Sequence, residues 1–395
     1  MRGVLDGVRV LDFGRYVAAP YCATLLGYLG ADVIRIERPG GGDDRWIAPL
    51  ADDGSGAVFL QTGCNKRSVC LKLGSSAGDE VRSRLLRSAD VVVSNFPPAI
   101  QRRLGFDYAT LCETKPDIIL ANVSAFGTEG PLAAQGGFDG VGQAMSGAMF
   151  MTGDPGKPAK AAAPYVDYTT AVLTAFAVMA ALRERDRSGQ GQEVSAALLA
   201  SALAVFNSHL IEQSVAKVDR QPTGNRVQTS APSDVFATED GHVLVHCPGD
   251  AIFKRWCALV EKPEFETDPR FANDQLRGDH RDALCEPMAK WCAARTSAAA
   301  LEQLAAAGVP SGPVLSIQQA LDHAQTQALG VLGKVEYPGL SSPAPVADMP
   351  VRLSVSDTGI RGRPPTAGEH TDQVLAELGF SSAEIIDMRA DGTVA

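Results

Sequence analysis

Residues 8–37, VRVLDFGRYVAAPYCATLLGYLGADVIRIE, decide the fold. The short apolar runs at 8–13 and 32–37 are typical of strands that are buried in a sheet. Between them, Pro20 suits the first turn of a helix and Gly30 suits its end. Two parallel strands joined by a helix need a right-handed crossover and a sheet that is covered on both faces.

The same alternation continues along the chain. Further strands are predicted at 89–94 and 117–123, which favours a doubly wound α/β domain. After about residue 225 the pattern changes, and Asp240-Gly241 predicts a hairpin turn between two short strands. A smaller α+β unit is predicted there, because amphipathic helices follow the hairpin at 250–261, 281–295 and 297–307.

The composition is that of an ordinary globular protein. The 395 residues include 36 basic and 46 acidic side chains, for a net charge of −10, and 45% are hydrophobic. This length predicts about two domains, and the acidic balance argues against a nucleic-acid partner. The most apolar window, 171–182, is too short for a membrane span and predicts a core helix. The eight cysteines contain no CxxC pair, so we expect free thiols and a cytoplasmic protein.

Several common sites lack their signatures. The turn after the first strand reads Gly14-Arg15-Tyr16-Val17-Ala18-Ala19, which is not the GxGxxG of a dinucleotide site, so NAD or FAD is disfavoured. His242 and His246 share a predicted strand rather than one helical face, so no metal site is predicted. The chain also has no GxSxG nucleophile elbow.

Asp167 is the remaining catalytic candidate. It directly precedes an apolar helix predicted at 168–184, and a helix that is apolar on every side is buried. An aspartate in this place is most often a structural N-cap. The helix dipole and the free N–H groups would, however, keep such a buried carboxylate ionised, as a nucleophile requires.

At this point the sequence resembles a known family, the class III CoA-transferases, also called the CaiB/BaiF group. The resemblance covers essentially the whole chain, and an ordered set of short motifs carries it. These motifs are 5–13, 30–39, Asn65-Lys66-Arg67-Ser68, 90–96, Ser124-Ala125-Phe126-Gly127, 167–183 and Gly189-Gln190-Gly191-Gln192.

The resemblance implies a reaction in which Asp167 is the nucleophile. Its carboxylate attacks the thioester of a donor acyl-CoA and gives a mixed anhydride, and the released CoA thiolate then forms an aspartyl-CoA thioester. An acceptor acid reverses the two steps. The partners implied are an acyl-CoA and a small carboxylic acid; CoA is a cosubstrate, and no permanently bound cofactor is needed. Backbone N–H groups near Gly136 and Gly137 are expected to stabilise the oxyanions.

The resemblance also assigns binding residues. The CoA contacts implied are Arg15, Tyr16, Val17, Ala18, Arg38, Leu71, Lys72, Leu73, Asn95, Phe96, Arg103 and Leu104; the substrate contacts are Arg15, Gly136, Gly137 and Phe138. Arginine suits CoA phosphates because its planar fork pairs with them bidentately. The family often has a lysine where this chain has Gly74, so Lys72 would have to replace its contact. We also hypothesise that Arg15 binds the second carboxylate of a dicarboxylate such as succinate.

The family implies a large Rossmann-like domain built from both chain ends, a smaller α+β domain, and an interlocked homodimer. The expected boundaries are 1–195 and 331–395 for the large domain and 225–310 for the small one, with linkers at 196–224 and 311–330. Some members carry a tetraglycine lid, but this chain has Cys247-Pro248-Gly249-Asp250 there, with one glycine.

Two alternatives stay open. One is an α-methylacyl-CoA racemase-like enzyme, since related racemases share the fold and the aspartate. Racemases add a histidine in the segment that corresponds to 136–139, where this chain has Phe138; the nearest histidine in sequence is His209. Proton exchange needs two groups that flank the carbon, so the missing histidine favours transfer. The other alternative is a non-catalytic CoA-binding homologue.

Overall fold

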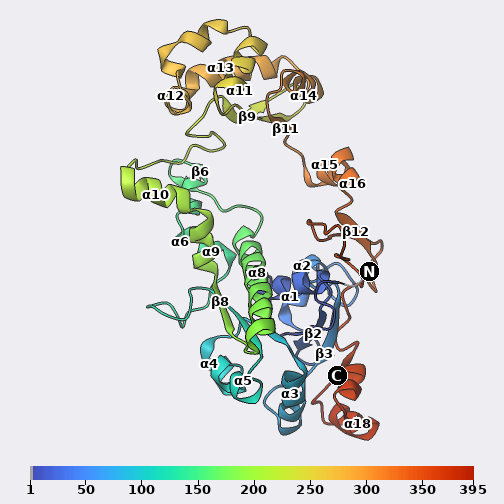
Figure 1. Cartoon of the computed structure of the whole chain (residues 1–395). Helices are drawn as coiled ribbons and strands as arrows, with labels where there is room; N and C mark the ends of the chain where they lie inside the picture. Colours follow the sequence, from blue (N-terminus) through green and yellow to red (C-terminus); the bar gives the residue numbers. More distant parts are fainter. Residues whose placement is uncertain (1–2) are drawn as a thin grey trace. The chain divides into compact units, whose positions relative to one another are not determined.

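The computed structural model describes residues 3–395, which form two compact units (Figure 1). The large unit contains the chain up to Ala148, then Ala161–Val215 and Gln327–Ala395; the small unit contains Met149–Lys160 and Ala216–Thr326. The strand β11 (Ser311–Pro313) pairs with the small unit's hairpin, within the stretch predicted as the second linker.

The large unit is an α/β fold around one parallel sheet. Its strands run in the order β3-β2-β1-β4-β5-β8, and every neighbouring pair is parallel. The strands are β1 (Arg9–Asp12), β2 (Asp32–Glu37), β3 (Lys66–Cys70), β4 (Val91–Ser94), β5 (Ile119–Ser124) and β8 (Glu193–Ala197). The predicted class, a doubly wound parallel sheet, is confirmed, although β3 and β8 were not foreseen.

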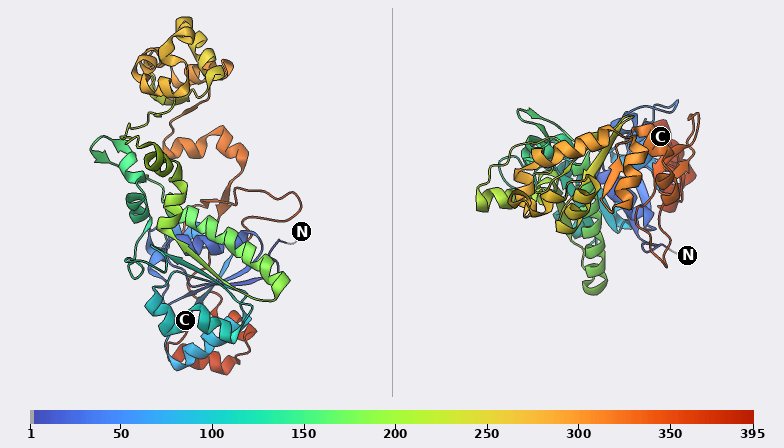
Figure 2. Two further views of the ribbon diagram at one scale, coloured as in Figure 1. Left: turned by 60° about the vertical axis from the view of Figure 1, so that its left-hand side comes forward. Right: turned by 90° about the horizontal axis from the view of Figure 1, so that it is seen from above.

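Helices cover both faces of this sheet (Figure 2). Along β1 the side chains alternate, so Val10 joins the core beneath one layer and Leu11 the core beneath the other. One layer consists of α1 (Ala18–Tyr28) and α8 (Tyr165–Ser188); the other consists of α3 (Ser76–Ser88), α4 (Pro98–Leu104), α5 (Tyr108–Thr114), α17 (Thr371–Glu377) and α18 (Ser382–Ala390).

The remaining elements of the large unit are short. They are η1 (Asp43–Trp46), α2 (Ala57–Thr62), α6 (Asp139–Met145), α9 (Leu198–Val205) and the antiparallel pair β12 (Leu332–Val335) and β13 (Ala344–Ala347). Two helices, α7 (Ala148–Met151) and α10 (Asn207–Ala216), lie where the chain passes between the units, as does α16 (Ala324–Leu329).

The small unit is α+β, and its predicted hairpin is confirmed. Strands β9 (Ser233–Ala237) and β10 (His242–His246) pair antiparallel around the Asp240-Gly241 turn. The helices are α11 (Asp250–Leu259), α12 (Asp274–Asp279), α13 (Arg281–Ala293), α14 (Ser297–Ala306) and α15 (Ile317–Asp322), with the 3-10 turns η2 (Pro263–Thr267) and η3 (Pro269–Phe271) and the pair β6 (Gly153–Asp154) and β7 (Lys157–Pro158). All eight cysteines of the chain are free thiols.

Helix α8 differs from its prediction in two ways. It begins at Tyr165, so Asp167 lies inside its first turn instead of preceding it. It is also not buried on every side: Val172, Leu173 and Phe176 are 51%, 44% and 73% exposed. By length and hydropathy alone the helix could cross a membrane, but half of its most apolar window is buried, against α1 and the sheet. The apolar residues of α8 therefore form two different faces: one is buried in the core, and the other is exposed.

A buried ion pair fixes the start of the fold. The Lys66 ammonium donates to Asp12 Oδ2 at 2.7 Å and to the carbonyl of Pro20 at 2.7 Å, and both ionic side chains are fully buried. Asp12 Oδ1 accepts the N–H of Gly14 at 2.8 Å. The pair thereby ties the end of β1, the following turn and the first turn of α1 to β3, the strand on the other side of β2.

We predict that Lys66→Met lowers the free energy of unfolding by about 3 kcal/mol, because it leaves a buried carboxylate without its counter-charge. Denaturant unfolding at pH 7 measures the change. The matched control is Lys115→Met, which removes a more exposed lysine paired with Asp117 and is expected to cost less than about 1 kcal/mol. Equal losses for the two variants would contradict the structural role of Lys66.

Candidate functional site

The site lies in the crevice where the strand order reverses. In an open α/β sheet this point is the usual ligand site, because the connections leave neighbouring strands in opposite directions. Here it separates the carboxyl ends of β1 and β4. The Asn95 side chain joins the two ends: its Oδ1 accepts the N–H of Arg15 at 3.0 Å, and its Nδ2 donates to the carbonyl of Arg15 at 2.9 Å.

A buried charge cluster holds the next residue. Tyr16 has a φ of +66°, a left-handed conformation that costs a side-chain-bearing residue of order 1 kcal/mol. Its N–H donates to Asp44 Oδ2 at 3.2 Å, and Arg35 in turn binds both oxygens of Asp44 at 2.7 and 2.8 Å. Asp44 and Arg35 therefore hold the backbone of this loop in place. The ring of Tyr16 lies edge-on to Phe138, with 5.2 Å between the ring centroids.

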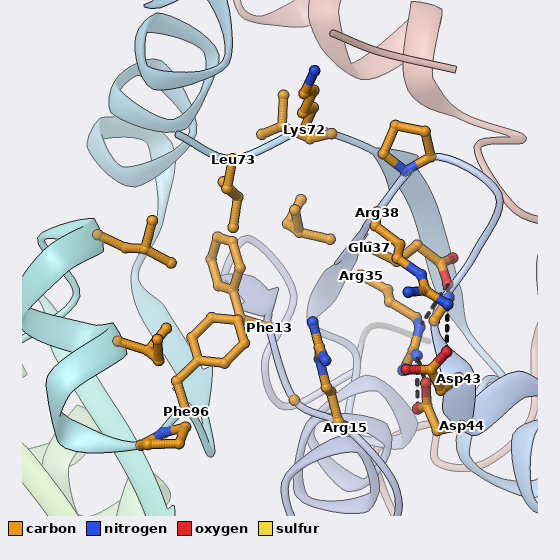
Figure 3. A pocket seen from close by; sticks show the side chains of 18 of the residues that line it. Phe13, Arg15, Arg35, Glu37, Arg38, Asp43, Asp44, Lys72, Leu73 and Phe96 are labelled. Atoms are coloured by element: carbon orange, nitrogen blue, oxygen red, sulfur yellow. Dashed lines mark hydrogen bonds and ion pairs between the residues drawn. The ribbon is translucent and has the colours of Figure 1, made fainter. Parts of the chain in front are cut away.

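A first cavity of about 440 Å³ opens on one side of this loop (Figure 3). We call it the basic cavity. The predicted site residues that line it are Arg15, Arg38, Leu71, Lys72, Leu73, Phe96, Arg103 and Leu104. Arg38 binds Asp43 and donates to the carbonyl of Gly41 at 3.0 Å. Within residues 3–395, the side chains of Arg15, Lys72 and Arg103 make no hydrogen bond or ion pair, so three cations remain available for an anionic ligand.

A second cavity of about 370 Å³ lies on the other side, and we call it the aspartate cavity. The predicted residues that line it are Arg15, Tyr16, Val17, Ala18, Asn95, Phe96, Gly136, Gly137, Phe138 and Asp167. Arg15 and Phe96 line both cavities, so the two adjoin. Every site residue predicted from the sequence thus lines at least one of them.

The sequence analysis missed Asp139, which carries out the capping expected of Asp167. Its Oδ1 accepts the N–H of Val166 at 2.8 Å and that of Asp167 at 3.3 Å, at the start of α8. Its Oδ2 accepts from Gln143 Nε2 at 2.6 Å. Asp139 lies beside the predicted Phe138, but its separation from Asp167 in sequence gave no sign that its side chain caps the helix that carries Asp167.

The environment of Asp167 corrects one expectation. Burial, and secondarily the negative charge of Asp139, raise the pKa of Asp167 from its ordinary 3.8 to about 7. We expected the helix N–H groups to keep this carboxylate ionised, but Asp139 accepts them instead. Near neutral pH, Asp167 therefore exists as both the acid and the carboxylate, and the carboxylate form is poorly solvated and hence reactive.

Comparison with known proteins identifies the family. The model of "CoA-transferase family III" matches residues 5–371. The chain belongs to CoA-transferase family III. It is 32% identical over 389 residues to a succinyl-CoA:mesaconate CoA-transferase of Haloarcula marismortui, covering 96% of this chain and 98% of that protein.

Two further relatives agree with this family III assignment. A succinate–glutarate CoA-transferase of Agrobacterium fabrum is 33% identical over 393 residues, with 95% of each chain covered. A crystal structure of a CaiB/BaiF family protein from Brucella suis superposes with a TM-score of 0.85 at 30% identity, covering 96% of this chain and 100% of that one. The chain is accordingly a CoA-transferase, an enzyme that uses CoA as cosubstrate.

The aspartate cavity of this family III chain also offers backbone donors. Within the part of the chain that the structure describes, the N–H groups of Gly136 and Gly137 donate no hydrogen bond. A Cβ at Gly137 would meet Ala125 Cβ at 3.0 Å, so any larger residue there would press on the cavity wall. Two free amides near a carboxylate are suited to binding a developing oxyanion.

We predict that Asp139→Asn shifts the pH dependence of the reaction to lower pH. The change removes a neighbouring negative charge, so the pKa of Asp167 falls below about 7, while the amide oxygen can still accept the N–H of Val166. The transfer rate, measured from pH 5.5 to 8.5, should reach half its plateau at a lower pH than in the wild type. Asp117→Asn, which alters a surface carboxylate, should leave the profile unmoved; an unshifted Asp139→Asn profile would exclude the electrostatic coupling.

Proposed function

We propose that this chain moves CoA from an acyl-CoA donor to a free carboxylic acid through covalent intermediates on Asp167. The observation that carries the proposal is the place of Asp167: a buried carboxylate in a cavity that adjoins a second cavity with unpaired cations. The basic cavity would hold the phosphates of CoA. The pantetheine arm of CoA would then pass Arg15 and Phe96, which line both cavities, towards Asp167.

The proposed chemistry proceeds in four balanced steps. A carboxylate oxygen of Asp167 attacks the thioester carbon, the C–S bond breaks, and a mixed anhydride and CoA thiolate result. The thiolate attacks the aspartyl carbonyl carbon, the anhydride C–O bond breaks, and the donor acid leaves as its carboxylate. The acceptor carboxylate then attacks the carbonyl carbon of the aspartyl-CoA thioester, the C–S bond breaks, and a second mixed anhydride and CoA thiolate result. The thiolate finally attacks the acceptor's carbonyl carbon in this anhydride, the C–O bond breaks, and the new acyl-CoA and the free carboxylate of Asp167 are released. The amides of Gly136 and Gly137 would stabilise each oxyanion.

The acids are proposed to be dicarboxylates. The relatives reported above are named for succinyl-CoA with mesaconate and for succinate with glutarate. Among the described residues that line the aspartate cavity, Arg15 is the one cationic side chain. Its guanidinium, 5.7 Å from the ring centroid of Phe96 and without an anionic partner, suits the distal carboxylate of such an acid.

Transfer is favoured over racemisation by the same cavity. None of the described residues that line it is a histidine, and Phe138 packs against Tyr16 where a racemase would need its second acid–base group. Incubation of a 2-methylacyl-CoA in deuterated water, without any acceptor acid, should leave the α-proton unexchanged.

We further propose a cytoplasmic homodimer. The exposed apolar face of α8, with Val172, Leu173 and Phe176, supports a partner surface, as does Val215 at 79% exposure in α10. Apolar side chains gathered on one open face mark a protein–protein contact more often than a solvated surface. The free cysteines support a reducing compartment.

We predict that Asp167→Asn lowers the transfer rate by at least about a thousandfold, the scale on which removal of a nucleophile acts. Affinity for CoA should change little, because Asp167 does not line the basic cavity. Rates come from mass spectrometry of donor and acceptor thioesters, and affinity from calorimetry. Hydroxylamine added during turnover should label a peptide that contains Asp167 in the wild type; near-normal transfer by Asp167→Asn would refute the assignment.

The same variant has a stability signature. Because the pKa of Asp167 is about 7 in the folded chain against an ordinary 3.8, the folded state binds the proton more tightly, and stability falls as pH rises from about 4 to 7. Asp167→Asn escapes this loss. Its thermal midpoint should therefore exceed that of the wild type at pH 8, and the difference should shrink towards pH 4. A difference independent of pH would show that Asp167 ionises normally.

We predict that Arg15→Met lowers the preference for dicarboxylates about 10- to 100-fold, the worth of a lost charge-assisted hydrogen bond. The measured quantity is the ratio of kcat/KM for glutarate to kcat/KM for butyrate with one acyl-CoA donor. Any effect of Arg15 on CoA binding cancels in this ratio. Arg15→Lys, which keeps the charge, should retain part of the preference, and an unchanged ratio in Arg15→Met would remove Arg15 from substrate selection.

A further inference from the structure

Residues 393–395 form backbone hydrogen bonds with one wall of the basic cavity, although they lie more than 300 residues later in the sequence. Beyond β3, Leu71, Lys72 and Leu73 continue at the edge of the sheet and line the cavity. Figure 3 shows Lys72 and Leu73 in this wall. Leu71 still pairs with β2, through its N–H and the carbonyl of Glu37 at 2.7 Å. On its other side it forms an antiparallel bridge with Val394. We call Thr393, Val394 and Ala395 the clamp.

Backbone hydrogen bonds join the clamp to this wall on both sides of Leu71. The N–H of Lys72 donates to the carbonyl of Thr393 at 2.8 Å, and the N–H of Ala395 donates to the carbonyl of Cys70 at 3.3 Å. A side chain adds a second connection, because Thr371 Oγ1 donates to the carbonyl of Ala395 at 2.7 Å and accepts the N–H of Cys70 at 3.2 Å. Without the clamp, the edge of this segment would be open to water.

The clamp is itself firmly held. Val394 is 2% exposed and belongs to the same core cluster as Leu71. The N–H of Thr393 donates to Asp391 Oδ1 at 2.8 Å, and hydrogen bonds from Thr393, with a smaller contribution from the Lys72 ammonium, hold the pKa of Asp391 below its ordinary value. The ammonium of Lys72, which lines the basic cavity, thus interacts electrostatically with Asp391, and Asp391 in turn anchors the clamp through Thr393.

We propose that the clamp is a positioning segment for CoA: it holds Leu71–Leu73 in the conformation that completes the basic cavity. This inference rests on the proposed role of that cavity in binding CoA. The contacts of the clamp described above are with Cys70, Leu71, Lys72, Thr371 and Asp391, and none of these residues lines the aspartate cavity. Loosening it should therefore weaken CoA binding and leave the chemical steps nearly intact.

Two variants test the clamp in the full chain. Val394→Ala removes buried packing and keeps every backbone bond, whereas Ala395→Pro removes the N–H that donates to Cys70 and places the proline ring there. For both we expect the KM of the acyl-CoA donor to rise about three- to tenfold, with kcat and the KM of the acceptor acid within about twofold of wild type. Amide hydrogen exchange at Leu71–Leu73 should accelerate in parallel.

Val92→Ala is the matched control, because Val92 is a buried valine of the same core that lines neither cavity. It should lower the thermal midpoint about as much as Val394→Ala without moving any KM. If Val394→Ala and Val92→Ala raise the donor KM equally, or if neither clamp variant raises it, the clamp has no positioning role.

Calorimetry with free CoA separates this inference from the proposed reaction. If the wild type binds CoA but transfers it to no acid, the proposed function fails, and weaker CoA binding by the clamp variants still supports the clamp. If the wild type transfers CoA and all variants bind CoA equally well, the clamp alone is refuted. Failure of the wild type to bind CoA would overturn both.

Discussion

The arrangement of the site depends on the buried pair of Lys66 and Asp12. This pair holds the turn between β1 and α1 at both ends, through the N–H of Gly14 and the carbonyl of Pro20. Four of the residues between these two anchors, Arg15 to Ala18, line the aspartate cavity together with Asp167. A buried ion pair contributes little net stability when compared with apolar packing, but it tolerates few alternative arrangements once formed. Here it selects one path for a loop that must present backbone and side chains to two cavities.

The site places two carboxylates close together at the start of α8. Asp139 is fully hydrogen-bonded, whereas Asp167 is left buried without a cation beside it. A structure optimised for stability alone would avoid this arrangement. It gives the two groups different properties, since the bonded one caps a helix and the poorly solvated one has a raised pKa. The proposed role of Asp167 thus depends on the difference between two aspartates rather than on Asp167 alone.

The sequence was informative where the signal is local. The pattern of 8–37 predicted β1, α1 and β2, and the family resemblance singled out the Arg15–Ala18 loop, which lines the aspartate cavity. Residues whose importance comes from distant contacts were missed: Asp139 caps a helix that begins 26 residues later, and Asp44 supports Tyr16 from another element. The open face of α8 was missed for a different reason, because an apolar pattern does not distinguish a buried helix face from an exposed apolar one.

The pairing of Leu71 with Val394 has a consequence for how the molecule is made. Chains leave the ribosome from the N-terminus, at roughly 5–20 residues per second, and early domains usually fold before later ones appear. The edge beyond β3 cannot be completed in this way, because Leu71 pairs with Val394, which is synthesised long after it. The basic cavity is therefore finished only after the small unit has emerged. During synthesis the open edge of β3 is a place where a nascent chain can pair wrongly, and the basic cavity gains its complete wall only once Val394 has been made.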